Sequence, residues 1–336
     1  MTSSRRGSRY SRRIVGLTGA VLVAVLVFTA GWYYVAGRLE RTVEAALADL
    51  GGDARAACRD AQVRGFPFRI GVFCDGVSYE NPARAVAAEA GALRTAAQIY
   101  QPTRVVAELD GPARLALPGL PPLAVGWQSL RASARLARPL PERLSLAGSA
   151  LTVATAGDGA RLAGAAGGEL HARPAGADLD LAVRLDGLAL AGGVLDAALP
   201  PLDATATLRV ADGAADAAAL AGGLPGSLRG RSAVIEALTV RTADAGAGDA
   251  AATGLTLSGP VSLSPEGLLD AELSVTVDNP QALAALLARA LPAQRQAIET
   301  ALSGIAALGE TPRIPVRIAR GEVIVGFFTV GRIPPL

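Results

Sequence analysis

The sequence predicts a mainly β protein of the α+β class. We expect an N-terminal transmembrane helix followed by a large, mostly antiparallel, curved β-sheet, with a C-terminal helix pair packed on it. The prediction depends on one uncharged apolar stretch, many short segments in which apolar and polar residues alternate, and one long helical pattern near the C-terminus. Alternation with a period of two is typical of strands that have one buried and one solvated face. Short gaps between these segments leave little room for crossover helices and favour antiparallel pairing.

The first element is the apolar stretch 14–36, which contains no charged residue. As a helix its 23 residues reach roughly 34 Å, enough to cross a hydrocarbon core about 30 Å thick. The preceding tail, residues 1–13, carries five arginines, and this charge asymmetry predicts a cytoplasmic N-terminus. Residues 38–336 would then form a periplasmic domain, anchored by a single pass in a bacterial inner membrane. Three aromatic residues at the outer end suit the membrane–water boundary: Trp32, Tyr33 and Tyr34.

A cleaved signal peptide is the alternative interpretation of the same stretch. Cleavage requires small residues at the first and third positions before the cut. A cut after Ala30 would place Phe28 at the third position, and a cut after Ala36 would place Tyr34 there. Both residues are bulky, and the apolar run is longer than the core of a usual signal peptide. The pattern therefore favours an uncleaved anchor.

The next elements are a helix and a hairpin. Leu39, Val43 and Leu47 recur at helical spacing in residues 38–50, which we expect to continue from the membrane helix. Residues 54–78 read as a hairpin whose tip contains three residues that suit a tight turn: Gly65, Phe66 and Pro67.

The two cysteines of the chain, Cys58 and Cys74, are equidistant from Phe66. A hairpin centred on Phe66 would place them opposite each other, with Cβ atoms roughly 4.5–5.5 Å apart, close to what a disulfide needs. Such a bond would stabilise the fold by about 3 kcal/mol. An even number of cysteines in an exported domain also favours a disulfide, although two unrelated buried thiols are the alternative.

The alternating segments continue through 179–186, 202–210 and 269–278. Their apolar positions form a candidate groove: Leu181, Val183, Leu273 and Val275. Only one further helical segment, 280–308, could cover these strands. It begins at the N-cap Asn279 with Pro280 in the first turn and is interrupted at Pro292. We expect this helix pair to pack on the sheet, with a lid or partner surface as the alternative. The sheet then either closes into a sandwich or leaves an apolar face open.

Composition and motifs argue against several functions. The net charge of +2 comes largely from the N-terminal tail, so the exported part is near neutral and no nucleic-acid partner is expected. The single histidine, His171, would share a strand face with Glu169, but no motif links a nucleophile to the pair. Three aspartates follow strand alternation without the dense spacing of a calcium loop: Asp178, Asp180 and Asp186. We therefore expect no catalytic residues, no metal, no cofactor and no enzyme activity.

Several of these features occur together in one bacterial family. They are the basic start, the anchor, the hairpin Arg64-Gly65-Phe66-Pro67-Phe68 between two cysteines, and a regularly spaced C-terminal set: Gly321, Gly326, Gly331 and Pro334. The chain resembles the proteobacterial family described as domain of unknown function 2125. The resemblance implies an inner-membrane anchor and an extended, mostly β exported domain, and it brings no catalytic residues. More loosely, the design is similar to the AsmA-like envelope proteins, which handle lipid between bacterial membranes.

Two functional hypotheses follow. In the first, the domain binds or passes membrane lipid, or assists envelope assembly, because an open apolar groove beside a bilayer suits an acyl chain. In the second, the protein is structural or scaffolding, its β core is closed, and its helix pair binds an envelope protein partner.

Overall fold

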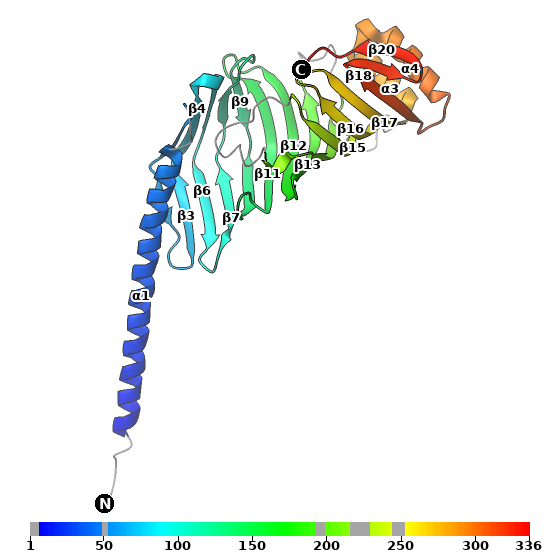
Figure 1. The fold of residues 1–336 in the computed structure, drawn as a ribbon. Helices are drawn as coiled ribbons and strands as arrows, with labels where there is room; N and C mark the ends of the chain where they lie inside the picture. Colours follow the sequence, from blue (N-terminus) through cyan, green and yellow to red (C-terminus); the bar gives the residue numbers. More distant parts are fainter. Residues whose placement is uncertain (1–6, 49–52, 192–198, 216–228, 244–252) are drawn as a thin grey trace, which may run out of the picture.

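The computed structural model describes residues 7–48, 53–191, 199–215, 229–243 and 253–336 (Figure 1). Figure 1 shows a curved sheet with a long helix along one end and a pair of short helices at the other. This arrangement confirms the predicted fold class.

The long helix, α1 (Gly7–Ala48), contains both the apolar stretch 14–36 and most of the helix expected over 38–50. It also contains residues 7–13 of the basic tail, while residues 1–6 and 49–50 lie outside the described parts. Nothing in the sequence breaks the helix between the two segments, because no proline occurs there and helical spacing resumes directly after Gly37. The segment Arg13–Ala48 is long and apolar enough to cross a membrane.

The described residues contain twenty strands after α1, and every pairing between these strands is antiparallel, as predicted. They are β1 (Arg55–Arg59), β2 (Gln62–Arg64), β3 (Arg69–Cys74), β4 (Gly76–Asn81), β5 (Val86–Ala90), β6 (Leu93–Gln98), β7 (Gln101–Leu109), β8 (Ala113–Ala116), β9 (Leu123–Gly126), β10 (Ser129–Arg135), β11 (Arg143–Thr155), β12 (Arg161–Ala175), β13 (Asp178–Leu190), β14 (Leu202–Val210), β15 (Ser232–Thr242), β16 (Gly254–Leu263), β17 (Leu269–Asp278), β18 (Arg313–Ala319), β19 (Glu322–Val325) and β20 (Phe328–Arg332).

The topology is simpler than the number of strands suggests. The first ten strands form five kinked runs, β1/β2, β3/β4, β5/β6, β7/β8 and β9/β10, and each run pairs with the next along both of its halves. Both halves of the fifth run then pair with β11. From β11 to β20 each strand pairs with its successor. The sheet is therefore one up-and-down meander, and it is not closed, because no pairing joins its first run to β20 in the described residues.

The cysteines form the expected disulfide, with the two Cα atoms 5.2 Å apart. The prediction that they lie directly opposite each other was wrong, since Cys58 pairs with Val77 in the register of β1 and β4. The hairpin has a four-residue loop, closed by the Arg69 N–H donating to the Gly65 carbonyl at 2.9 Å, so its centre lies beyond Phe66. The left-handed backbone of Asp60 (φ 51°) interrupts the strand after Cys58 and allows the offset cysteines to meet.

The C-terminal helix pair consists of α3 (Pro280–Ala290) and α4 (Arg295–Ala306). The Asn279 side chain caps α3 by accepting from the Ala282 N–H at 3.2 Å. A short 3-10 turn that starts at Pro292 separates the two helices. Their apolar side chains pack on β17 and β18 around Val277 and Ile314, which confirms a helix pair packed on the sheet.

Candidate functional site: an apolar sheet face between two helical ends

One face of the sheet carries apolar residues in continuous cross-strand rows. Strand register aligns one such row, which we call the long row, across ten neighbouring strands from β7 to β18. Its members are Ala107, Ala132, Leu146, Leu170, Val183, Ala206, Leu238, Leu257, Val275 and Ile314. No polar residue interrupts this row. The row exists because strand alternation and pairing register agree over ten consecutive strands.

A second row runs beside the first on the same face, two residues away along each shared strand from β7 to β14 and three residues away on β15, where the register shifts. We call it the anchor-side row, because it starts next to α1. Its members are Ile70, Ala97, Val105, Ala134, Leu144, Ala172, Leu181, Leu208 and Ile235. The two rows together are called the apolar face below.

Helices cover this face only at its two ends in the described structure. At the first end Ile70 is buried against Trp32 and Ala36 of α1. At the other end Ile314 is buried beneath α3 and α4. Between them Leu170, Val183 and Leu238 are only half-buried, and Leu144 is 41% exposed. A closed β core would bury the middle of the sheet most deeply, so the described residues do not fit the closed-core alternative.

The four residues predicted to form a groove lie on the same face, but they differ in whether a helix covers them. Leu181 and Val183 lie on β13, in the part that no described helix covers. Val275 belongs to the long row but packs against the α3–α4 cluster. Leu273 lies two residues earlier on β17, where it pairs with Val316. Alternation thus places all four side chains on one side of the sheet, but only the two residues of β13 lie in its uncovered middle.

Sequence reasoning missed the part of the apolar face between β7 and β12. Ala107 and Ala132 are too small to give a strong hydrophobic signal, and Leu146 and Leu170 lie in segments rich in glycine and alanine. Alternation around Leu144 and Leu146 was the one signal that could have identified this part.

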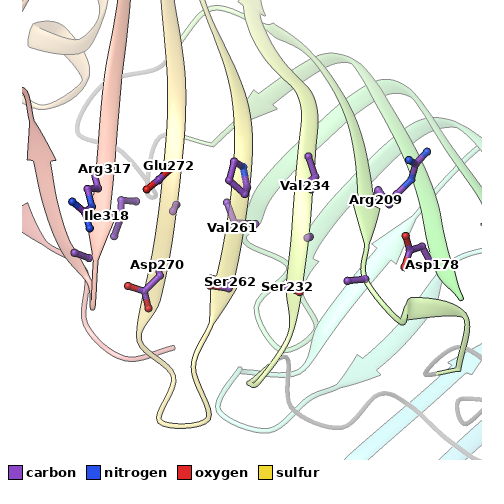
Figure 2. Close-up of a pocket in the computed structure, with 15 residues that line it drawn as sticks. Asp178, Arg209, Ser232, Val234, Val261, Ser262, Asp270, Glu272, Arg317 and Ile318 are labelled. Carbon is purple, nitrogen blue, oxygen red and sulfur yellow. The ribbon is translucent and has the colours of Figure 1, made fainter.

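The opposite face is polar. The same register aligns a row made of charged residues and threonines across β12 to β18: Glu169, Arg184, Thr205, Thr239, Thr256, Thr276 and Arg313. A hollow of about 500 Å³ lies over β13–β18, from Asp178 to Arg317, and Figure 2 shows Glu272 beside Arg317 within it. The sheet is therefore amphipathic along its length.

Asp180 is the most enclosed carboxylate of the ion pairs on the polar face, with its side chain 17% exposed. It accepts hydrogen bonds from Arg209 at 2.7 Å and Arg173 at 3.0 Å. The hydrogen bond from Arg209 is the main cause that lowers the pKa of the Asp180 carboxyl; desolvation opposes it, and the hydrogen bond from Arg173 adds to the lowering. Of the three aspartates considered for a metal, Asp180 is thus paired with two arginines and Asp186 with Arg184. The described residues contain no group of three or more side chains that could hold a metal ion.

An Asp180→Asn variant should melt at a lower temperature than the wild type at neutral pH, and the difference should shrink in acid. The lowered pKa means that Asp180 contributes its stability above the unfolded-state pKa of about 3.9, and that this contribution is lost as pH falls through the folded-state value. Melting curves of both proteins from neutral pH to about pH 3 measure this difference. Asp53→Asn, an exposed position without an ion pair among the described residues, is the control. A gap of equal size at every pH would contradict the assignment.

His171 has a neighbour that the sequence did not reveal. Its Nδ1 lies 2.9 Å from Ser145 Oγ and its Nε2 lies 3.3 Å from Glu169 Oε2. The register of β11 and β12 pairs Ser145 with His171 across 26 residues of sequence, which no local motif indicates. Ser145, His171 and Glu169 are residue types that could serve as nucleophile, base and acid, but the likeness to a catalytic triad ends at residue type. The backbone amides around it belong to strands paired on both sides, so they provide no preorganised oxyanion donors.

Comparison with known proteins gives one result. The family model described as "Uncharacterized protein conserved in bacteria (DUF2125)" matches residues 32–334. No curated protein and no solved structure matches the chain, so the looser likeness to AsmA-like proteins gains no support from these comparisons. The matched region begins at Trp32, the residue that joins α1 to the sheet, and includes every strand of the apolar face. The chain therefore belongs to the DUF2125 family of bacterial proteins.

Proposed function

We propose that this protein is a single-pass protein of the bacterial inner membrane whose periplasmic sheet binds acyl chains of membrane lipid on its apolar face. In this role it passes lipid away from the membrane or assists envelope assembly. The observation that carries the proposal is the position of the apolar face. It starts at strands packed on a helix that could cross a membrane, and it continues without a polar residue to the distal helix pair.

The dimensions and chemistry of the face support an acyl ligand. Ten strands about 4.8 Å apart give the long row a length of roughly 43 Å, whereas one leaflet of a bilayer core is about 15 Å thick. An acyl chain needs apolar surface and few directed polar contacts. The uncovered middle of the face offers aliphatic side chains on adjacent strands, including Leu170, Val183 and Leu208.

Site-specific photocrosslinking tests this proposal directly. We expect a photoreactive amino acid at Val183 to form adducts with phospholipid in cells, detected by mass spectrometry of the purified chain. The matched control is Ala182, the preceding residue, which faces the polar side of the same strand. Equal lipid labelling at both positions, or none at Val183, would reject acyl binding on this face.

A charge on the apolar face should remove the ligand. Ala206→Glu introduces a carboxylate between Val183 and Leu238, whereas Thr207→Glu introduces the same group on the polar face of the same strand. Placing an unpaired charge against an acyl chain costs more than 1.4 kcal/mol, so we expect co-purified lipid to fall about tenfold or more in the first variant only. Retention of the Cys58–Cys74 disulfide serves as the folding control.

The membrane orientation needs its own test. A cytoplasmic N-terminus and a periplasmic domain follow from the five arginines before Ile14. A reporter that is active only in the periplasm, fused after Leu336, should be active, and the same reporter fused before Met1 should be silent. The reverse pattern would overturn the compartment together with the proposed lipid function.

A scaffolding role is the second candidate, and a different surface favours it. The last strand, β20, forms one edge of the sheet, and Phe328 and Val330 on it are 76% and 60% exposed. The preceding Phe327 is fully exposed. An exposed apolar edge strand suits an added strand from an envelope protein partner. Photocrosslinking from Phe328 should then capture a specific protein. Capture through residues 280–308 instead would place the partner on the C-terminal helix pair.

A further inference from the structure

The loop between β2 and β3 lies against α1, at the level where the apolar stretch of the helix ends. Phe66 in this loop contacts three aromatic residues of α1, with its ring centroid 5.5 Å from Trp32, 6.1 Å from Tyr33 and 6.4 Å from Phe28. The Trp32 indole N–H donates to the Arg69 carbonyl at 3.0 Å, directly after the loop. The height of this loop along the helix is therefore fixed by packing and by a hydrogen bond.

The position of Phe66 along α1 determines how deep it lies in the bilayer. If Arg13 marks the inner limit of the hydrocarbon core, about 20 residues of helix cross the core, and its outer limit falls near Tyr33. Phe28 then lies roughly 8 Å inside that limit, because each residue rises about 1.5 Å. A tilted helix needs more residues to cross, which would place the loop deeper. Phe66, held between Phe28 and Tyr33, thus falls within the outer hydrocarbon boundary.

Two neighbouring turns of the sheet share this end, and both expose apolar side chains. The β6–β7 turn is joined to the loop by the Ile99 N–H donating to the Phe68 carbonyl at 3.2 Å. The β10–β11 turn is joined to β7 by the Leu136 N–H donating to the Thr103 carbonyl at 2.7 Å. Phe68 is 68% exposed, Tyr100 71% and Leu136 46%. Single exposed residues are ordinary, but here they occur at three neighbouring turns at the same end of the strands.

Arginines flank these turns. Arg64 and Arg69 bracket the first loop, Arg104 follows the second turn, and Arg138 lies in the third. All four side chains belong to exposed residues. Exposed apolar side chains with exposed arginines close to them in the same turns match the chemistry of a bilayer interface, which offers an acyl region to apolar groups and phosphates to cations.

We propose that three turns, 65–68, 99–100 and 136–142, insert their apolar tips into the outer leaflet beside α1 and bring the start of the apolar face into contact with lipid. Ile70, the first member of the anchor-side row, is covered by α1, but Val105 in the same row is only partly buried, so acyl chains reach the row beside α1 without crossing water. The proposal rests on the membrane placement given under Proposed function. A protein surface could also bind exposed aromatic residues, but the fixed height of the loop within the span of α1 favours lipid.

Fluorescence quenching in nanodiscs tests the insertion. The full-length protein is reconstituted in phosphatidylethanolamine and phosphatidylglycerol, with or without bromine atoms on the acyl chains. Three single variants, Phe68→Trp, Tyr100→Trp and Leu120→Trp, are compared with the unmodified chain, whose own tryptophans, Trp32 and Trp127, give the baseline. Leu120 is the matched control, because it is 55% exposed in the β8–β9 turn at the opposite end of the strands.

We expect brominated lipid to quench the added emission at positions 68 and 100, and to leave the emission at position 120 unchanged. Absence of quenching at position 68, or equal quenching at all three positions, overturns the insertion. This result is independent of the crosslinking test at Val183. Quenching at position 68 without lipid adducts at Val183 would leave the membrane contact standing and reject acyl binding on the sheet. Adducts at Val183 without quenching at position 68 would support acyl binding on the sheet and reject insertion of the turns.

Discussion

Trp32→Ala should reduce the free energy of unfolding by about 3–5 kcal/mol, the range found for removing a large buried aromatic side chain. Trp32 is 7% exposed, packs with Ala36 and Ile70, and donates a hydrogen bond to the Arg69 carbonyl. Its loss leaves a cavity between α1 and the sheet and an unpaired carbonyl. Denaturant titration in detergent, followed by circular dichroism of the strands, measures the change.

Two further variants separate the contributions in this prediction. Trp32→Phe keeps an aromatic ring but loses the donor, and we expect it to cost about 1 kcal/mol from the hydrogen bond. Tyr34→Ala removes a neighbouring aromatic side chain that is 65% exposed, and it should have little effect. If Trp32→Ala and Tyr34→Ala were equally mild, the helix would not be coupled to the sheet through this contact.

Gly71→Ala should be nearly as destabilising as Trp32→Ala. We expect it to lower the free energy of unfolding by about 3 kcal/mol, because of strain between two strands. A Cβ at Gly71 would lie 1.8 Å from the Thr95 carbonyl oxygen on β6, closer than any real contact. The backbone cannot easily move away, because Thr95 Oγ1 accepts from the Val72 N–H at 2.7 Å and donates to the Val72 carbonyl at 3.0 Å. The same denaturant titration measures the loss.

Gly157→Ala is the matched control for Gly71. No atom lies within 4 Å of a Cβ built there, and its backbone is not in the left-handed region, so stability should stay within about 0.5 kcal/mol of the wild type. A similar effect of both substitutions would show that the close approach of β3 and β6 is not what makes Gly71 necessary.

The features that sequence predicted well depend on local patterns. The apolar stretch 14–36, the alternation in β13, β14 and β17 and the capped start of α3 each follow from residues close together in the chain. The disulfide was also predicted, although its geometry was not. A symmetric spacing of cysteines around Phe66 does not reveal a four-residue loop or the left-handed turn at Asp60.

The features that sequence could not predict depend on register over many strands. The long row requires ten strands to align without a slip, and a shift of one residue in any pair would end it. No single segment contains that information. The contact between Phe66 and Trp32 joins residues whose only sequence signal is aromatic character, and the Ser145–His171 pair depends on strand register alone.

Pairing only between successive strands has a consequence for how such proteins change over evolutionary time. Insertion or loss of one hairpin in the middle of the meander would leave the other pairings intact and would alter the length of the sheet across its strands by about 10 Å. A closed barrel does not tolerate this, because its curvature and stagger depend on the number of strands. The length of the sheet, and with it the length of the apolar face, can therefore change by whole hairpins while the α1 end and the α3–α4 end stay the same.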